Sequence, residues 1–461
     1  MPVERFEVGV IGAGYVGLAT GACLAHLGHR VTCLDNDEER VTSLGEGRVP
    51  FYEPGLEGLV ARTARAGRLS FAGTERLAGV VREAGVVFIA VGTPQGDDGS
   101  ADLSNVASVA RQVGRALASS PRRERPLVVV NKSTVPVGSG DYVSGLIRDG
   151  AGEEDVASFL VVSNPEFLRE GSAIYDTLFP DRIVVGADSR EALETMRTLY
   201  QPIIEQSFPT QMDPRPKATV PFVSTDLAST EMIKYASNAF LATKISFINE
   251  ISNLCELVGA DVGSVATGIG LDGRIGPRSL DAGIGWGGSC LPKDVAAMRA
   301  MAREQGYEPA LLDATVAVNE RQRELVIQKL ERDLHCLKDR RVALLGLSFK
   351  PNTDDVRGAP SLEIARALDS LGAKVVGYDP VAGKAAAKLL PALQVLFDPY
   401  EAIDGAHAVV VVAEWEEVRN LDPKKAASLI REPKLVVDGR NALDQTSWRK
   451  AGILYRGFGR G

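Results

Sequence analysis

Short apolar runs recur along the first part of the chain, at residues 6–11, 30–34, 86–94, 127–136, 159–163 and 181–186. Most of them run directly into glycine, proline or polar residues, and several are separated by helical patterns. Continuous apolar runs of this length are typical of strands that are buried on both faces of a parallel sheet. The pattern predicts an open parallel sheet with helices packed on both of its faces.

A different pattern begins at residue 208. Residues 208–224 hold Pro209, Pro214, Pro216 and Pro221 among polar residues, which predicts a loop or linker at a domain boundary. Residues 226–258 contain neither glycine nor proline and can form one helix of about 50 Å.

The sides of this long helix differ in polarity. One narrow arc carries Glu231, Lys234, Asn238, Asn249 and Asn253, and much of the remaining circumference carries Met232, Ile233, Phe240, Leu241, Phe247, Ile248 and Leu254. The pattern predicts a helix that is buried on most sides, spanning domains or pairing with a partner subunit. Burying a lysine is costly unless it is paired or used, so Lys234 is either functional or half of a structural Lys–Glu pair.

After helical patterns at 294–306 and 311–333, the chain repeats its opening architecture. Apolar runs at 341–346, 373–379, 407–413 and 434–438 parallel four runs of the first part. We therefore predict the α/β class, with two doubly wound parallel sheets joined by a central helical segment. The predicted domains are 1–207, 208–333 and 334–461.

Composition narrows the classes of function. The net charge of -8, with no long basic run, argues against nucleic acid and membrane surfaces as partners. No apolar run approaches the roughly 20 residues of a membrane helix, and the strand-like start leaves no room for a signal peptide, so we expect a cytoplasmic protein. The five cysteines are scattered and form no Cys-x-x-Cys or Cys/His cluster, so neither a disulfide framework nor a metal site is predicted.

The first apolar run leads into Gly12-Ala-Gly14-Tyr15-Val16-Gly17, and the second ends at Asp35. In a dinucleotide-binding turn, the first glycine permits a tight turn, the second admits a pyrophosphate and the third packs helix on strand. A carboxylate about 20 residues later holds the ribose hydroxyls of NAD and would repel the 2′-phosphate of NADP. The pattern predicts an NAD site, although a glycine-rich turn without a ligand has the same signature.

Polar residues follow three further predicted strands. Thr93 and Thr134 come after the third and fourth runs and are expected to line the cofactor cleft, unless they serve only the turns. Residues 164–171 follow the fifth run and carry Glu166 and Glu170, four residues apart, of which Glu170 is as readily a solvated helix residue.

Residues 283–294 place Cys290 among four glycines, with Lys293 and Asp294 close behind. We expect the glycines to leave the backbone uncovered for a ligand, and Lys293 to favour the reactive thiolate. A thiol beside a nicotinamide site predicts oxidation through a thiohemiacetal and a thioester. The alternative is a small structural cysteine in a glycine turn.

Motifs along nearly the whole chain resemble the nucleotide-sugar 6-dehydrogenases. They are GAGYVG at 12–17, YEPG at 52–55, VGTP at 91–94, KSTVP at 132–136, NPEFLREG at 164–171, EMIKYASN at 231–238, DGRIG at 272–276, GGSCLPKD at 287–294, FK at 349–350 and DGR at 438–440. The resemblance implies two Rossmann-like domains, the first for NAD and the second for a UDP-sugar. It also implies a helical dimerisation segment that carries the loop around Cys290 at residues 283–294, called the Cys loop below. The implied reaction is a four-electron oxidation of a sugar C6 alcohol with two NAD.

The resemblance also implies roles for individual residues. Cys290 is similar to the nucleophile, Lys234 to the group that stabilises oxyanion charge, and Glu166 to the general acid/base for hydrolysis. Asn238 is expected to bind the sugar, while Asp294 and Thr134 are expected to position the water. The implied cofactor contacts also include Tyr15, Val16, Lys293 and Arg357, and the implied substrate contacts are Phe167, Leu168, Glu170, Lys234, Asn238, Arg274, Gly287, Lys350 and Arg440. Arg274 is expected to reach the partner subunit's site.

The resemblance leaves several substrates open. Ser279, Asp281 and Trp286 stand where many relatives carry other residue types. UDP-glucose is the leading substrate, GDP-mannose is its closest rival, and UDP-N-acetylhexosamines fit the Pro-Lys-Asp run less well. A non-catalytic nucleotide-sugar-binding protein is the alternative from a different class, although a binder would need few of the catalytic residues together.

Overall fold

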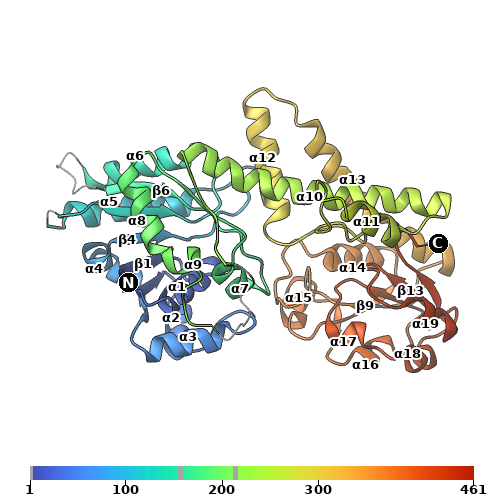
Figure 1. The fold of residues 1–461 in the computed structure, drawn as a ribbon. Helices are drawn as coiled ribbons and strands as arrows, with labels where there is room; N and C mark the ends of the chain where they lie inside the picture. Colours follow the sequence, from blue (N-terminus) through green and yellow to red (C-terminus); the bar gives the residue numbers. More distant parts are fainter. Residues whose placement is uncertain (1–3, 122, 153–158, 211–215, 217, 461) are drawn as a thin grey trace. The chain divides into compact units, whose positions relative to one another are not determined.

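The computed structural model describes residues 4–121, 123–152, 159–210, 216 and 218–460. The chain divides into two compact units, Met1–Ala236 and Ser237–Gly461, and each is built around its own sheet (Figure 1). The division into three domains at residues 207 and 333 stays a prediction.

The first unit contains an eight-stranded sheet in the order β3-β2-β1-β4-β5-β6-β7-β8. The strands are β1 Glu7–Ile11, β2 Arg30–Asp35, β3 Leu69–Gly73, β4 Val86–Ile89, β5 Leu127–Asn131, β6 Phe159–Ser163, β7 Ile183–Gly186 and β8 Phe222–Thr225. Strands β1 to β6 are parallel, and β7 joins β6 in antiparallel register. The order of the parallel part, 3-2-1-4-5-6, is that of dinucleotide-binding folds.

Helices cover both faces of this sheet, as Figure 1 shows. They are α1 Tyr15–His26, α2 Glu38–Gly45, α3 Leu56–Arg65, α4 Leu77–Glu83, α5 Ser104–Ala118, α6 Ser139–Ala151, α7 Ala173–Leu178, α8 Arg190–Leu199 and α9 Gln201–Ile204, with a short 3₁₀ turn at Thr74–Arg76. Each face of the sheet therefore has its own apolar core.

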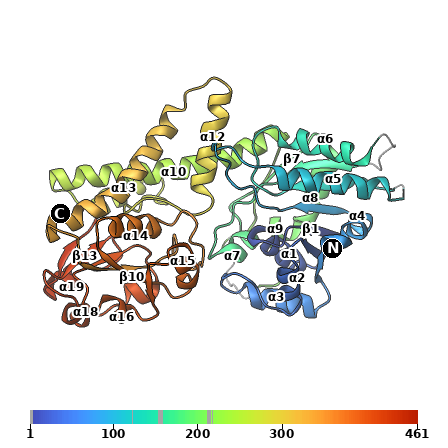
Figure 2. The same cartoon turned by 180° about the vertical axis from the view of Figure 1, so that it is seen from behind.

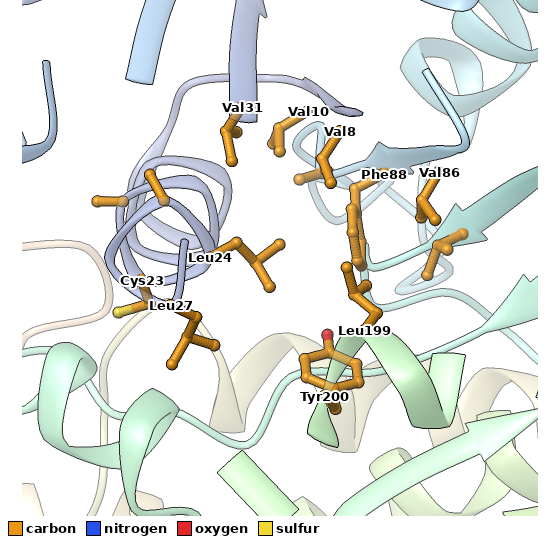
Figure 3. Close-up of a cluster of buried hydrophobic side chains, with 14 of the residues drawn as sticks. Val8, Val10, Cys23, Leu24, Leu27, Val31, Val86, Phe88, Leu199 and Tyr200 are labelled. Carbon is orange, nitrogen blue, oxygen red and sulfur yellow. The ribbon is translucent and has the colours of Figure 1, made fainter. Parts of the chain in front are cut away.

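Alternate residues of the central strands point into the two cores. Val8, Val10, Val86 and Phe88 pack against α1, α8 and α9, and Figure 3 shows them beside Leu24 and Leu199. The intervening residues, such as Val87 and Ile89, pack against α4, α5 and α6. Burial on both faces explains why the strands read as continuous apolar runs.

The second unit contains a six-stranded parallel sheet in the order β11-β10-β9-β12-β13-β14. Its strands are β9 Arg341–Leu345, β10 Lys374–Tyr378, β11 Gln394–Leu396, β12 Ala408–Val411, β13 Leu435–Asp438 and β14 Leu454–Arg456. Numbered from β9, the order is again 3-2-1-4-5-6, which confirms the predicted repeat of architecture and the predicted fold class.

Helices also cover both faces of the second sheet. They are α14 Pro360–Ser370, α15 Gly383–Leu389, α16 Pro399–Ile403, α17 Glu416–Arg419, α18 Pro423–Leu429 and α19 Gln445–Lys450. Preceding the sheet are α10 Leu227–Val258, α11 Val262–Gly270, α12 Leu291–Glu304 and α13 Ala310–Leu334. Helices α12 and α13 form a hairpin (Figure 2), and α13 packs against the second sheet.

The long helix α10 has 32 residues, as the absence of glycine and proline predicts. Its surroundings differ from the prediction of burial on most sides. The polar residues Glu231, Lys234 and Asn249 are buried, whereas Phe240, Phe247 and Leu254 are exposed in the single chain. The prediction is wrong within one chain because the polar arc faces the protein and much of the apolar side does not.

The predicted linker at 208–224 is also partly wrong. Its end, Phe222–Thr225, forms β8 and pairs in parallel with β7. Proline and polar residues concealed this strand, which lies at the edge of the sheet and is half-exposed. Residues 211–215 and 217, with Pro214 among them, lie outside the described residues.

None of the helices in the described part of the chain is long and apolar enough to cross a membrane. The longest ones, α10 and α13, both carry charged side chains within their length.

A close helix–helix contact in the first unit gives a test of the fold. A Cβ atom on Gly114 of α5 would lie 2.0 Å from the carbonyl oxygen of Ile147 on α6. We expect Gly114→Ala to lower the free energy of unfolding by about 1–3 kcal/mol, because the helices must move apart. Guanidinium unfolding followed by circular dichroism measures the change.

Gly145 of α6 is the matched control, since no described atom lies within 4 Å of its Cβ position. Gly145→Ala should raise stability by up to about 1 kcal/mol through helix propensity alone. Equal effects of the two substitutions would contradict the described packing of α5 on α6.

Candidate active site

The glycine turn after β1 has the geometry that its three predicted roles require. Gly12 has a φ of +100°, and a Cβ on Gly17 would lie 1.8 Å from the Gly12 carbonyl oxygen. No described atom lies within 4 Å of the Cβ position of Gly14. The first glycine therefore makes the turn, the third packs α1 against it, and the second leaves room for a pyrophosphate at the start of α1.

Asp35 lies at the end of β2, and its buried side chain is close to the same turn. Its Oδ2 accepts a hydrogen bond of 2.7 Å from the backbone N–H of Ala13. Arg40 donates to both of its carboxylate oxygens, at 3.1 and 3.0 Å. The carboxylate holds the glycine turn in place and is located where it can meet the ribose of NAD, so these residues fit the predicted cofactor.

Arg40 is a neighbour that the motif did not reveal. Its two bonds use acceptor positions on Asp35 that ribose hydroxyls would also use. A bound ribose must therefore share Asp35 with Arg40 or move the guanidinium aside.

The loops after β4 and β5 meet as predicted. The hydroxyl of Thr93 donates to the carbonyl oxygen of Thr134 at 2.9 Å. Ser133 also donates to the carbonyl oxygen of Val91 at 2.7 Å. Thr93 and Thr134 therefore lie together at the carboxyl ends of neighbouring parallel strands, where ligands of such sheets bind.

Lys234 and Glu166 form a buried ion pair in the first unit. The Nζ of Lys234 lies 2.9 Å from Oε1 of Glu166, and their side chains are 5% and 7% exposed. Oε2 of Glu166 accepts from the N–H of Leu168 at 2.8 Å. The ring of Phe167 lies 5.5 Å from the Lys234 ammonium. Four predicted residues are thus brought together, and the pair agrees with both interpretations of Lys234.

A second buried glutamate supports this loop from its other end. Glu53 of the YEPG motif accepts from the N–H groups of Gly171 and Ala173 at 2.6 and 2.7 Å. The Tyr15 hydroxyl accepts from the Gly171 N–H at 2.9 Å. The loop that carries Glu166 and half-buried Glu170 is therefore tied to the glycine turn. Sequence reasoning gave Glu53 no role, because its partners are more than 100 residues away.

In the second unit, Cys290 is exposed and lies at the start of α12. Asp294 is 1% exposed and accepts from Nδ2 of Asn238 at 2.5 Å and from Nζ of Lys293 at 2.7 Å. The positive end of a helix favours a thiolate, and Asp294 holds the ammonium of Lys293 one turn from the thiol. Asn238 lies one helical turn after Lys234 on α10, on the same face.

The four glycines before Cys290 do not have the predicted role. A Cβ on Gly283 or Gly287 would lie 2.2 Å from a carbonyl oxygen, that of Gly439 or Gly358. On Gly285 it would lie 2.3 Å from Oδ1 of Asn319, and on Gly288 it would lie 2.7 Å from the Phe349 ring. The prediction of uncovered backbone is wrong, because these glycines allow the loop to pack closely against the protein.

The Cys loop is also held by hydrogen bonds from several elements. Gly283 donates to Oδ1 of Asn249 on α10, and Ile284 donates to the carbonyl oxygen of Gly439. Trp286 is 6% exposed, and its indole N–H donates to Ser246 at 3.0 Å. The Trp286 side chain is therefore part of the packing of this loop.

Arg440 lies beside the same loop. Its Nε donates to the carbonyl oxygen of Val412 at 2.7 Å, Nη1 to that of Gly285 at 3.1 Å and Nη2 to that of Phe349 at 3.2 Å. Desolvation lowers the pKa of this guanidinium. Arg440 joins the Cys loop to the carboxyl edge of the second sheet, where half-buried Lys350 also lies.

Asp379 in the second unit makes different contacts from those of Asp35. Asp379 follows β10 as Asp35 ends β2, but its Oδ2 accepts from the N–H groups of Leu347 and Ser348 and from the indole of Trp415. Its other oxygen accepts from two backbone N–H groups. This arrangement agrees with the prediction that the second sheet binds a different group.

Two predicted arginines lie outside these clusters. Arg274 is 89% exposed at its side chain and pairs with Asp272. Arg357 is 68% exposed and pairs with Asp355. The described residues contain no group of three or more His, Cys, Asp or Glu side chains that could hold a metal ion. The roles of all these residues stay predictions.

Three domain profiles of one family match the chain in order. The NAD binding domain of the UDP-glucose/GDP-mannose dehydrogenase family matches residues 6–204, its central domain matches residues 228–321, and its UDP binding domain matches residues 343–445. The chain belongs to this family.

Individual members of the UDP-glucose/GDP-mannose dehydrogenase family match over nearly full length. UDP-glucose 6-dehydrogenase of Rhizobium meliloti is 46% identical over 98% of this chain and 99% of its own length. UDP-glucose 6-dehydrogenase TuaD of Bacillus subtilis is 43% identical over 98% and 93%. The solved structure of a UDP-glucose dehydrogenase from Pyrobaculum islandicum has a TM-score of 0.89 and 39% identity, covering 100% and 99%.

The contact between Asp35 and Arg40 predicts how cofactor choice can be changed in this family member. We expect Asp35→Asn to raise the ratio of kcat/KM for NADP to that for NAD by about tenfold, as roughly 1.4 kcal/mol of altered charge interaction would. The substitution removes a negative charge near a 2′-phosphate and leaves Arg40 able to meet it.

Asp37 is the matched control, because it also contacts Arg40, at 3.4 Å, but lies outside β2. Asp37→Asn should leave the ratio nearly unchanged. A ratio that responds equally to both substitutions would contradict the position assigned to Asp35.

Proposed function

We propose that this protein is a UDP-glucose 6-dehydrogenase, which converts UDP-glucose, two NAD and water to UDP-glucuronate and two NADH. The observation that carries the reaction class is the start of α12, where exposed Cys290 lies one turn from buried Asp294 and its partner Asn238. The near full-length relatives named as UDP-glucose 6-dehydrogenases support the substrate.

Each NAD, when bound, supplies the acceptor for one hydride, and two NAD are used for each substrate molecule. Gly12, Gly14 and Gly17 admit its pyrophosphate, Asp35 meets its ribose, and Thr93 and Thr134 line its cleft. The proposed further contacts of Tyr15, Val16, Lys293 and Arg357 rest on family resemblance.

The chain's own residues perform the remaining chemistry. Glu166 is proposed as the general acid/base for hydrolysis of the thioester. In the first oxidation, the water held by Asp294 and Thr134 takes the proton of the C6 hydroxyl, and the ammonium of Lys234 stabilises the charge on that oxygen. The thiolate of Cys290 then adds to the aldehyde carbon, and loss of a second hydride leaves a thioester. Asp294 and Thr134 position the water that releases the acid and regenerates the thiol.

The proposed substrate contacts come from several segments of the chain. Phe167, Leu168 and Glu170 lie on the loop of Glu166, and Asn238 lies one turn from Lys234. Gly287, Lys350 and Arg440 lie in or near the Cys loop of the second unit, and the positive charges of Lys350 and Arg440 suit a diphosphate. Arg274, exposed on the surface, is proposed to serve the partner subunit's site.

We also propose a homodimer in the cytoplasm. The exposed Phe240, Phe247 and Leu254 are seven residues apart on α10, so they lie on one side of the helix. Leu257 and Val258 extend this apolar surface and are 82% and 75% exposed. Large apolar side chains that are exposed along one helix in a single chain are typical of a subunit interface.

The substrate is tested by measuring NADH formation with individual nucleotide sugars. UDP-glucose should give two NADH for each molecule consumed, with GDP-mannose and UDP-N-acetylhexosamines at least about a hundredfold slower in kcat/KM. Turnover of GDP-mannose but not of UDP-glucose would show that GDP-mannose is the substrate. Binding of a nucleotide sugar without any turnover would favour a non-catalytic protein.

Cys290→Ser separates the mechanism from the substrate in the same assay. This variant should still bind NAD but form acid at least about a thousandfold more slowly, because a serine hydroxyl is not ionised at neutral pH. Undiminished acid formation would exclude Cys290 as the nucleophile while leaving the substrate unaffected.

The proposed dimer is tested by placing charge on α10. Phe247→Glu should raise the dissociation constant of the dimer by about a hundredfold, because a carboxylate would be buried in an apolar interface. Analytical ultracentrifugation measures the change. Phe397→Glu is the control, since Phe397 is 70% exposed but lies beside β11. A monomeric unmodified protein, or equal effects of both variants, would refute the interface.

A further inference from the structure

A cavity of about 60 Å³ in the first unit has Glu166 in its lining. Its lining includes the buried Lys132, Asn164, Glu166 and Tyr200 and the half-buried Asp176 and Arg182. Cys23 of α1 also lines it, and Figure 3 shows Cys23 and Tyr200 in the core on this face of the sheet. The volume is enough for several water molecules with polar partners.

Lys132 is the one buried amine among the residues that line this cavity. Its Nζ donates to Oδ1 of Asn164 at 3.1 Å, and the Tyr200 hydroxyl donates to the same oxygen at 2.7 Å. Asn164 in turn donates to the carbonyl oxygen of Val184 at 2.7 Å, which fixes the orientation of its amide. The amine can keep this bond in either protonation state, because both forms are donors.

The electrostatic surroundings of Lys132 favour loss of its proton. Burial lowers its pKa to about 8; the charge of Glu166 acts in the opposite direction, and that of Lys234 lowers the pKa further. The charged or titratable groups around the cavity are Glu166 on the 164–171 loop, Lys234 on α10, Asp176 on α7, Arg182 before β7, Cys23 on α1 and Tyr200 at the end of α8. Burial raises the pKa of Tyr200 far above its ordinary value, so its phenol stays protonated.

We propose that Lys132 and the water-filled cavity beside it carry protons from Glu166 to solvent. This inference rests on the proposed function, which makes Glu166 the group that receives a proton when water attacks the thioester. Lys132 touches neither substrate nor cofactor in this proposal and acts through Glu166 as a proton-relay residue.

The stoichiometry of the proposed reaction requires such a route. Oxidation of the alcohol to the aldehyde moves one hydride to NAD and releases one proton. Oxidation of the aldehyde with water moves a second hydride and releases two protons, because the product is a carboxylate. Glu166 is 7% exposed and held by Lys234, so it must pass its proton on before it can act again.

Two substitutions distinguish a proton relay from a structural amine. Lys132→Met removes both the charge and the proton, whereas Lys132→Arg keeps a positive donor for Asn164 but cannot release a proton at working pH. Tyr200→Phe is the control, since it removes the other donor to Asn164 and leaves the lysine in place.

The measurement is kcat for UDP-glucose oxidation from pH 6.5 to 9.5. The ratio of kcat for the unmodified protein to kcat for Lys132→Arg should rise about tenfold through pH 8, because only the neutral amine, formed above that pH, accepts a proton. Ionisations that both proteins share, such as that of Cys290, cancel in the ratio. For Tyr200→Phe the corresponding ratio should not change with pH, and KM should stay unchanged in both lysine variants.

A ratio for Lys132→Arg that is constant with pH, or an arginine variant as fast as the unmodified protein, overturns the relay. A second measurement needs no substrate. The ¹³Cε NMR signal of Lys132, assigned by its absence in Lys132→Met, should titrate near pH 8, and titration near the ordinary value for lysine also overturns the proposal. Failure of the unmodified protein to oxidise UDP-glucose would instead refute the proposed function.

Discussion

The ion pair between Lys234 and Glu166 is the interaction on which the arrangement of the first unit's site depends. Both side chains are almost wholly buried, and removal of either partner would take away the nearest compensating charge of the other. The pair joins α10 to the loop that follows β6. One turn earlier on α10, Glu231 accepts from the N–H groups of Gly138 and Gly140, at the start of α6, and from the Ser163 hydroxyl. Two buried glutamate contacts thus fix the first turns of α10, and with them the position of the Lys234 ammonium.

Whether the sequence predicted a strand depended on where that strand lies in its sheet. Central strands such as β4 and β12 are buried on both faces, so their sequences are continuous apolar runs that pattern alone reveals. The strands that the pattern missed are β3, β8, β11 and β14, and each lies at an edge of its sheet. The edge strands are only partly buried here, so neither a continuous run nor a clear alternation marks them.

The site was predictable where a residue's chemistry is local in sequence, and less so where it depends on distant partners. The glycine turn and the order Cys290, Lys293, Asp294 are contiguous signals. Arg40 beside Asp35 and Lys132 beside Asn164 became visible only when the fold brought separate segments together. The glycines before Cys290 show the limit most clearly. A glycine pattern indicates a close approach, but whether a ligand or the protein's own backbone makes that approach is decided by the three-dimensional packing.

The buried cluster of Lys132, Lys234 and Glu166 can both stabilise negative charge on a substrate and return to a state that costs less to bury. With Lys132 protonated, two ammonium groups and one carboxylate leave an excess positive charge, which favours negative charge developing on a substrate oxygen. Loss of the Lys132 proton leaves the neutral pair of Lys234 and Glu166, which costs less to bury. Because the two states differ by a single proton on an amine whose pKa lies near 8, the cluster can change between them at little cost. Lys234 keeps its carboxylate partner in both states, so the ammonium that faces the reaction does not have to move when the proton leaves.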